Sequence, residues 1–306
     1  MAQKKSQRLG MALRWLGTIL ATGLFIWLVA GQRWDVVLQQ AVGIAPWALC
    51  LSLVFYVVSY FFNTLRWCLL VWAQDVKISF WQAFRLVWAG IFASNFLFST
   101  IGGDGFRVVG LLRYTTNKTM ALGSVALDRL INVTAMACLL PLSLGMFGNL
   151  LVTPMFALPI PEKLRQLLMR FFSKIADVLR IWAAQPRIFL YAFLVAWPSN
   201  LFPIAATYLI ARQLEIDVTF WQVVGVQTAA YFINQLPSIN GYGLREASYT
   251  TLYSALGASI EQASTLALVT RFLSVAATLP GAFWLPASVT DAVLSDDKPV
   301  NETDPT

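Results

Sequence analysis

The sequence predicts an all-α integral membrane protein of about six to eight transmembrane helices in two inverted repeats, each with a re-entrant helical hairpin. Three observations support this class. Hydrophobic residues make up 58% of the chain and charged residues only 12%, about half the charged fraction of a soluble domain. Apolar segments long enough to span a bilayer recur along the chain. Finally, two stretches about 140 residues apart share three motifs in the same order.

The chain is expected to begin in the cytoplasm. Lys4 and Arg8 precede the first apolar run, residues 11–30, and basic residues stay on the cytoplasmic side of a membrane helix. We therefore expect an outward first helix and, over residues 46–72, a second helix that returns inward. Arg66, near the inner end of this second helix, is interpreted as an interface anchor whose guanidinium group reaches the lipid head groups.

Residues 80–112 predict a re-entrant hairpin. The segment is apolar enough to cross the membrane, but Arg113 after it belongs on the cytoplasmic side. The chain is therefore expected to turn at Gly102–Gly105 and come back, with its exposed backbone lining a polar cavity. Residues 120–160 are about two spans long, with Gly145–Gly148 near the middle, and predict two further crossings.

The second half follows the same order. Residues 161–187 carry leucine and phenylalanine at helical spacing between basic residues, which predicts an amphipathic linker helix on the inner leaflet. Residues 188–211 then cross outward, residues 220–256 form a second hairpin, and residues 264–289 cross back. The polar tail, residues 291–306, is expected to be disordered.

Each half contains a Phe-Trp-Gln motif, a glycine-rich motif that ends in Arg, and a second Arg. These motifs begin at Phe80, Gly102 and Asp128 in the first half and at Phe220, Asn240 and Thr270 in the second. Because the first copy starts outside and the second inside, the halves are predicted to be inverted about an axis in the membrane plane. We expect one transmembrane domain over residues 1–290, with repeat one over about 45–148 and repeat two over about 188–289.

Composition excludes several kinds of site. The chain has no His and three widely separated Cys, so a zinc or haem site and a His-dependent general base are not expected. A P-loop is not found in the sequence. The formal net charge of +7 comes from basic residues scattered among apolar helices, which argues for membrane orientation and anionic lipid rather than nucleic acid. We predict no metal, no cofactor and no catalytic residue.

The order Gly-Gly-Asp-x-x-Arg, Asp-Arg and Asn-Gly-x-Gly-x-Arg-Glu resembles the lysylphosphatidylglycerol synthase transmembrane-domain family, over roughly residues 15–289. This resemblance implies movement of a lipid across the bilayer, as inferred for members that flip aminoacylated phosphatidylglycerol. Those members add a soluble aminoacyl-transferase domain. The present sequence ends soon after its last predicted span, so lysyl transfer by this chain alone is disfavoured. A polyprenyl-phosphate lipid, as implied for some archaeal relatives, is a second candidate substrate.

Charged side chains inside apolar segments usually face a polar cavity. The repeats pair Arg107 with Arg245 and Arg129 with Arg271, and guanidinium groups around one cavity suit a phosphodiester. Glycines at both hairpin tips let backbone N–H groups approach an anion. The predicted substrate-binding residues are Gly102, Gly103, Asp104, Arg107, Asp128, Arg129, Asn240, Gly241, Gly243, Arg245, Glu246 and Arg271.

Structural alternatives exist for the same residues. The Asp128-Arg129 pair can form an ion pair with the other half, and Arg245 with Glu246 can brace the hairpin tip. Asp104 can cap the returning helix, and the glycines can serve tight turns and close packing. Neutral polar residues on both hairpins favour a cavity: Asn95, Gln227, Asn234, Gln235 and Asn240.

The sequence favours a transporter over an enzyme, namely a lipid translocase in the cytoplasmic (inner) membrane. Its expected partner is a membrane phospholipid or polyprenyl-phosphate lipid; a homo-oligomer or a separate lipid-modifying enzyme stays open. The alternative is a membrane-embedded transferase on a polyprenyl or phospholipid substrate, with Asp104, Asp128 or Glu246 as base. A scaffold for a separate enzyme is a third interpretation.

Overall fold

The computed structural model describes residues 39, 41–96, 100–156, 186–234 and 244–284, and all regular structure in this part of the chain is helical. Four of its helices are long and apolar enough to cross a membrane. They are α3 (Pro46–Trp72), α6 (Lys118–Ala137), α9 (Pro186–Gln213) and α12 (Ile260–Thr278) with the short 3₁₀ helix η1 (Leu279–Trp284) that continues it. The chain is thus an all-α integral membrane protein, as the sequence predicts. The predicted first helix, nearly all of the linker helix and the tail lie outside the described residues.

The first hairpin consists of α4 (Phe80–Phe96) and α5 (Thr100–Leu111), which are both too short to cross a bilayer alone. The predicted turn at Gly102–Gly105 is wrong, because these glycines lie inside α5 and the chain reverses between Phe96 and Thr100. The glycines serve packing instead. A Cβ atom on Gly90 of α4 would lie 2.6 Å from the Gly103 carbonyl oxygen, so the two helices touch backbone to backbone.

The second hairpin consists of α10 (Phe220–Ile233) and α11 (Leu244–Ala255). Its start repeats the start of the first. In α10 the Thr219 hydroxyl accepts from the Gln222 N–H, and the Gln222 side chain accepts from the Thr219 N–H at 2.7 Å. Ser79 and Gln82 form the same reciprocal pair before α4. The shared Phe-Trp-Gln motif is therefore a capping box that starts each hairpin.

The turns before the two hairpins also share a backbone conformation and a hydrogen bond. Asp75 and Glu215, 140 residues apart, are the described non-glycine residues with positive φ, at 57° and 56°. Three residues later the Ile78 N–H donates to the Val76 carbonyl in one half, and the Val218 N–H donates to the Ile216 carbonyl in the other, both at 3.0 Å. Local structure thus repeats where the sequences repeat.

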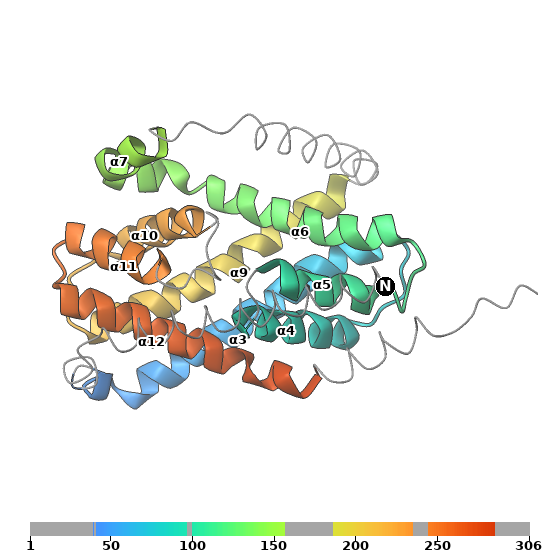
Figure 1. The fold of residues 1–306 in the computed structure, drawn as a ribbon, viewed down its shortest axis with the longest axis horizontal. Helices are drawn as coiled ribbons and strands as arrows, with labels where there is room; N and C mark the ends of the chain where they lie inside the picture. Colours follow the sequence, from blue (N-terminus) through green and yellow to red (C-terminus); the bar gives the residue numbers. More distant parts are fainter. Residues whose placement is uncertain (1–38, 40, 97–99, 157–185, 235–243, 285–306) are drawn as a thin grey trace, which may run out of the picture.

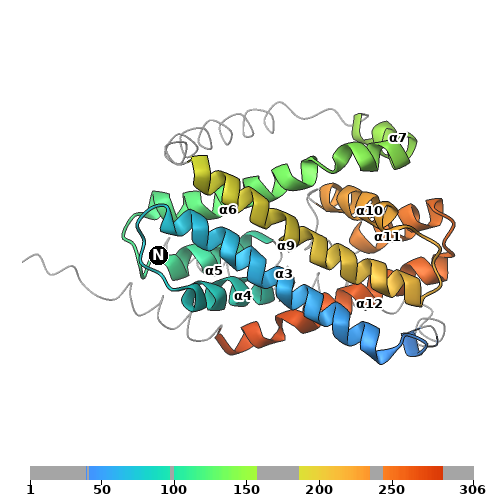
Figure 2. The same cartoon turned by 180° about the vertical axis from the view of Figure 1, so that it is seen from behind.

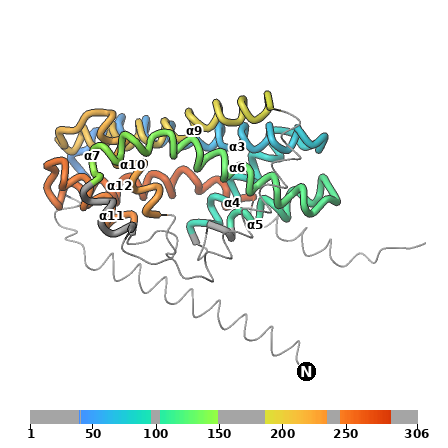
Figure 3. Tube along the Cα trace, turned by 90° about the horizontal axis from the view of Figure 1, so that it is seen from above, coloured from blue at the N-terminus to red at the C-terminus, as the bar shows by residue number. Residues whose placement is uncertain are grey.

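The two halves run in opposite directions. Helices α3 and α9 pack along each other antiparallel (Figures 1 and 2), and α6 and α12 also point in opposite directions. Hairpin α4–α5 enters from the end of the molecule where α3 finishes, whereas α10–α11 enters from the other end (Figure 1). Seen from above, α3 and α9 lie on one side, and α5 and α11 lie on the opposite side (Figure 3). The inverted arrangement predicted from charge bias is present in the fold.

Helix α7 (Leu140–Phe156) follows α6 and packs against α10. Its backbone is non-helical at Phe147, between Gly145 and Gly148, where the sequence predicts the reversal between two crossings. The remainder of the predicted return crossing lies outside the described residues.

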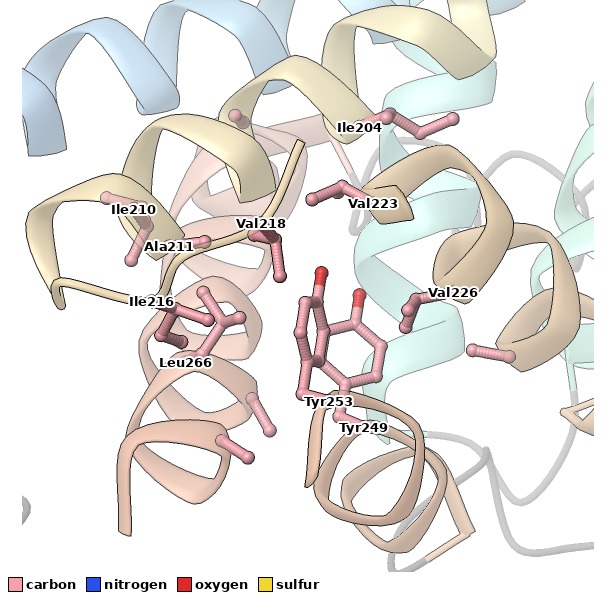
Figure 4. Close-up of a cluster of buried hydrophobic side chains, with 14 of the residues drawn as sticks. Ile204, Ile210, Ala211, Ile216, Val218, Val223, Val226, Tyr249, Tyr253 and Leu266 are labelled. Carbon is pink, nitrogen blue, oxygen red and sulfur yellow. The ribbon is translucent and has the colours of Figure 1, made fainter. Parts of the chain in front are cut away.

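The largest apolar core lies in the second half, where α9, α10, α11 and α12 meet. Tyr249 and Tyr253 project from α11 into this core beside Val223 and Val226 of α10 (Figure 4). Both rings are almost fully buried. This core fixes hairpin α10–α11 against the spanning helices and so positions the polar side chains at its inner end.

Candidate functional site

Asp128 is the centre of a buried ion-pair network. It is the eleventh of the 20 residues of α6 and therefore lies near the middle of a helix about 30 Å long. Its carboxylate accepts from the Arg66 Nε at 2.7 Å and from an Arg107 terminal nitrogen at 2.9 Å. The Asp128 side chain is only 2% exposed, so a lone carboxylate here would be very costly. The two guanidinium groups supply its counter-charge.

Arg66 is buried on the inward face of α3, so its predicted role as an interface anchor is wrong. Besides Asp128, its guanidinium donates to Asn132 at 2.6 Å, to Ser199 at 3.2 Å and to Asn63 at 3.3 Å. Ser199 belongs to α9, so Arg66 also links the two halves. Position along a helix suggested the anchor, but the direction in which the side chain points around the helix axis decides the outcome.

A second pair extends the network toward α5. Asp104 forms an ion pair with Arg107 at 3.6 Å and accepts a hydrogen bond from Arg129. Arg107 also lies over the Trp67 ring, with its guanidinium carbon 4.6 Å from the centroid. The pairs of Asp128 and Asp104 all form within the first half, and not with the second half as one structural alternative held. Within the described part of the chain, three guanidinium groups face two carboxylates in this network, which is an excess of one positive charge.

These charged groups line a cavity of about 620 Å³, within the range of small-molecule sites. It lies between α3, α4, α5, α6 and the inner end of α10. Polar groups contribute much of the wall: Asn63, Arg66, Ser94, Asp104, Arg107, Asp128, Arg129, Asn132, Tyr231 and Asn234. The Arg107 Nε is buried and has no hydrogen-bond partner among the described residues. A buried unpaired donor beside a cavity is the kind of group that a bound acceptor satisfies.

A smaller cavity of about 190 Å³ lies in the second half, and Arg245 is the charged residue among its described lining. Arg245 donates to the Tyr249 hydroxyl at 3.3 Å and to the Thr270 hydroxyl at 3.4 Å. Tyr249 donates in turn to Gln227 at 2.6 Å, and Gln227 donates to Thr207 at 2.6 Å. The hydrogen-bond partners of Arg245 are therefore neutral hydroxyl groups.

The two arginine sites are equivalent in the repeat but differ in charge. Arg107 and Arg245 lie at matching places in α5 and α11. Arg107 contacts α6 and Arg245 contacts the equivalent helix, α12. That contact is Asp128 in the first half and Thr270 in the second. The residue 140 positions after Arg66 is Ala206. The first half thus contains an additional Arg–Asp pair that the second half replaces with Ala and Thr.

The structure divides the predicted site residues between two cavities rather than gathering four arginines around one. Gly103 lines the larger cavity, and Gly102 lies beside it in α5. Glu246 follows Arg245 in the first turn of α11. Arg271 is partly buried on α12, outside the described lining of both cavities. The predicted residues Asn240, Gly241 and Gly243 lie outside the described residues.

Five polar residues of the larger cavity were missed as site residues from the sequence: Asn63, Arg66, Ser94, Asn132 and Tyr231. Asn132 follows the Asp128-Arg129 motif by one helical turn on α6, so helical spacing could have identified it. Asn63 likewise precedes Arg66 by three positions. In the described part of the chain, no cluster of three His, Cys, Asp or Glu side chains is placed to hold a metal ion.

The fold and the two cavities define a class: an all-α membrane protein built from two inverted halves, with charged cavities among its spanning helices. Residues 14–161 and 150–281 match the family model described as the lysylphosphatidylglycerol synthase TM region. The chain belongs to this family, which implies a function connected with membrane lipids. No curated protein matches the chain.

Proposed function

We propose that the chain is a lipid translocase that moves an anionic or phosphate-bearing lipid between the two leaflets. The observation that carries this proposal is the excess of guanidinium groups over carboxylates, among the described residues, in a cavity between the spanning helices α3 and α6 and the two hairpins. Phosphate is the anionic group that all phospholipids share, and it accepts the paired hydrogen bonds that guanidinium groups offer.

The physical task is to carry a charge through hydrocarbon, which costs several kcal/mol or more without compensation. A head group in the larger cavity exchanges water for Arg107 and the neutral amides around it, while its acyl chains remain in the bilayer. The volume of about 620 Å³ suits a glycerophosphate head group rather than a whole lipid. Family membership supports a lipid as the substrate.

The opposed hairpins suggest how the cavity opens to each side. Hairpin α4–α5 enters from one end of the molecule and α10–α11 from the other (Figure 1). In transporters built from inverted repeats, exchange of conformation between the halves exposes a central site to alternate sides. Alternation here brings the head group from Arg107, in the first half, to Arg245, in the second. We place the protein in the cytoplasmic membrane with its N-terminus in the cytoplasm.

Reconstitution tests the proposal. The purified chain is inserted into vesicles that contain head-group-labelled phosphatidylglycerol or phosphatidylethanolamine, and a membrane-impermeant reductant then bleaches label in the outer leaflet. We expect the bleached fraction to exceed one half and the double variant Arg107→Gln/Arg245→Gln to return it to the protein-free value. Arg212→Gln is the matched control, because Arg212 is about half exposed and pairs only with exposed Asp217 among the described residues. A second assay uses unlabelled polyprenyl phosphate and measures its transfer by its accessibility to an enzyme added outside the vesicles. If neither labelled phospholipid nor the polyprenyl phosphate is flipped, the result counts against the proposal.

The transferase alternative uses Asp104, Asp128 or Glu246 as a general base. The carboxylates of Asp104 and Asp128 already accept hydrogen bonds from guanidinium groups, so a substrate hydroxyl must displace an arginine before either carboxylate can take its proton. This pairing disfavours base catalysis by these two residues. Mass spectrometry of the lipids after reconstitution separates the two functions, because a translocase leaves every lipid mass unchanged.

A further inference from the structure

The two cavities meet at Tyr231 and Asn234, which line both of them. Both residues lie at the inner end of α10, with Asn234 as its C-cap. Arg107 lines the cavity on one side of this junction and Arg245 lines the cavity on the other. A group that moves from one cavity to the other through this junction therefore passes these two side chains.

A hydrogen bond between the halves spans the junction. The Asn132 side-chain amide of α6 donates to the Tyr231 hydroxyl of α10 at 3.2 Å. Asn132 is held firmly, since its carbonyl oxygen accepts from Arg66 at 2.6 Å and from Asn200 at 3.0 Å. Tyr231, the acceptor of the Asn132 hydrogen bond, belongs to hairpin α10–α11. The contact between Tyr231 and Asn132 is one hydrogen bond between neutral groups, a small barrier on the scale of protein contacts.

Asn234 provides an independent observation. Its side-chain oxygen is buried and has no hydrogen-bond partner among the described residues, although it belongs to a residue that lines both cavities. A buried oxygen without a donor is costly and uncommon in folded proteins. Such a group is suited to accept a hydrogen bond from a passing hydroxyl or ammonium group, which many phospholipid head groups carry beside the phosphate.

The first half has different side chains at the positions equivalent to Tyr231 and Asn234. The residues 140 positions before Tyr231 and Asn234 are Ile91 and Ser94, and both line the larger cavity. Smaller side chains at these places accompany a cavity of about 620 Å³, compared with about 190 Å³ in the second half. The two halves therefore differ in the size of the side chains at these equivalent positions.

We propose that Tyr231 and Asn234 form the gate between two phosphate-binding sites, one at Arg107 and one at Arg245. The Tyr231–Asn132 hydrogen bond holds this gate closed. The proposal rests on the translocase function proposed above. Asn234 hydrogen-bonds the polar part of the head group while the phosphate exchanges one arginine for the other.

The sharpest test is a reversible lock. In a chain whose three cysteines are replaced by alanine, Asn132→Cys and Tyr231→Cys are joined by a short reducible bifunctional thiol reagent. The rate of phosphatidylglycerol flipping is measured before linkage, after linkage and after reduction of the same sample. We expect at least a tenfold loss on linkage and recovery on reduction; each single-cysteine variant with the same reagent is the control. An unchanged rate in the linked protein overturns the gate.

Substitutions in the opposite direction complete the test. Tyr231→Phe keeps the ring but removes the acceptor of the Asn132 hydrogen bond, and we expect flipping to accelerate about two- to tenfold, the range that one hydrogen bond gives. Tyr231→Ile with Asn234→Ser installs the residues of the first half and should accelerate it further and admit phosphatidylinositol, whose head group is larger. Equal rates in all variants overturn the gate but leave the translocase proposal intact, whereas a wild-type chain that flips no lipid removes both.

Discussion

The additional Arg66–Asp128 pair of the first half allows a quantitative prediction. The second half has Ala206 and Thr270 at the corresponding positions and folds around Arg245 without a buried acid as its hydrogen-bond partner. We therefore consider three variants: Asp128→Thr, Arg66→Ala and the double variant that carries both changes. The double variant gives the first half the charge pattern of the second.

The expected magnitudes follow from burial. The side chains of Arg66 and Asp128 are 3% and 2% exposed, and removal of one partner of such a pair costs about 3–5 kcal/mol because a charge is left uncompensated. Asp128→Thr leaves both Arg66 and Arg107 without this carboxylate, so it belongs at the upper end. Arg66→Ala leaves Asp128 with Arg107 and belongs at the lower end. The double variant removes one positive and one negative charge, so the net charge is unchanged. We expect it to lower the free energy of unfolding by only about 1–3 kcal/mol.

The assay is the free energy of unfolding in bicelles, measured by steric trapping, for the wild type and the three variants. The cycle should give a coupling energy of at least about 3 kcal/mol, with the double variant more stable than Asp128→Thr alone. If the two single costs add to within about 0.5 kcal/mol, the buried pair is not a coupled unit. That result would refute the claim that Arg66 and Asp128 neutralise each other, on which the count of one excess positive charge in the cavity depends.

Three further predictions concern particular contacts. Gly90→Ala should destabilise the chain by about 1–3 kcal/mol in a thermal unfolding assay, because its Cβ would meet the backbone of α5. Gly105→Ala is the control and should leave the stability unchanged, because a Cβ at Gly105 meets nothing within 4 Å. Arg245→Gln should lower flipping at least tenfold yet cost less than about 1 kcal/mol of stability, since its hydrogen-bond partners are neutral; equal losses in both measurements would contradict a binding role. Thr219→Ala removes a capping box and should cost about 1 kcal/mol, and an unchanged melting temperature would contradict it.

Sequence patterns predicted the architecture well because hydropathy and charge act along the chain. The second span was expected at residues 46–72, and α3 covers Pro46–Trp72. The inversion followed from the positions of Lys and Arg, and the repeated Phe-Trp-Gln motif marked the start of both hairpins. Each of these features depends on local sequence or on the solvent that a segment meets.

The interior was harder to predict because it depends on how helices rotate and pack. Arg66 has the spacing of an interface anchor, and only the packing of α3 against α6 and α9 turns it inward to Asp128. Glycines in the Gly102–Gly105 motif are equally suited to a turn or to close helix contact, and the approach of α4 decides for contact. The division of the arginines between two cavities is seen only in the packed structure, where Tyr231 and Asn234 line both cavities.

The central claim is that a lipid head group passes through the protein between the two arginines. Photo-crosslinking tests it most directly, with phosphatidylglycerol that carries a diazirine on its head group and mass spectrometry of the labelled peptides in the wild-type chain. We predict label on the walls of both cavities, on α5 near Arg107 and on α10 near Tyr231. Label confined to the exposed apolar surface, at residues such as Leu190 and Phe272, would contradict it.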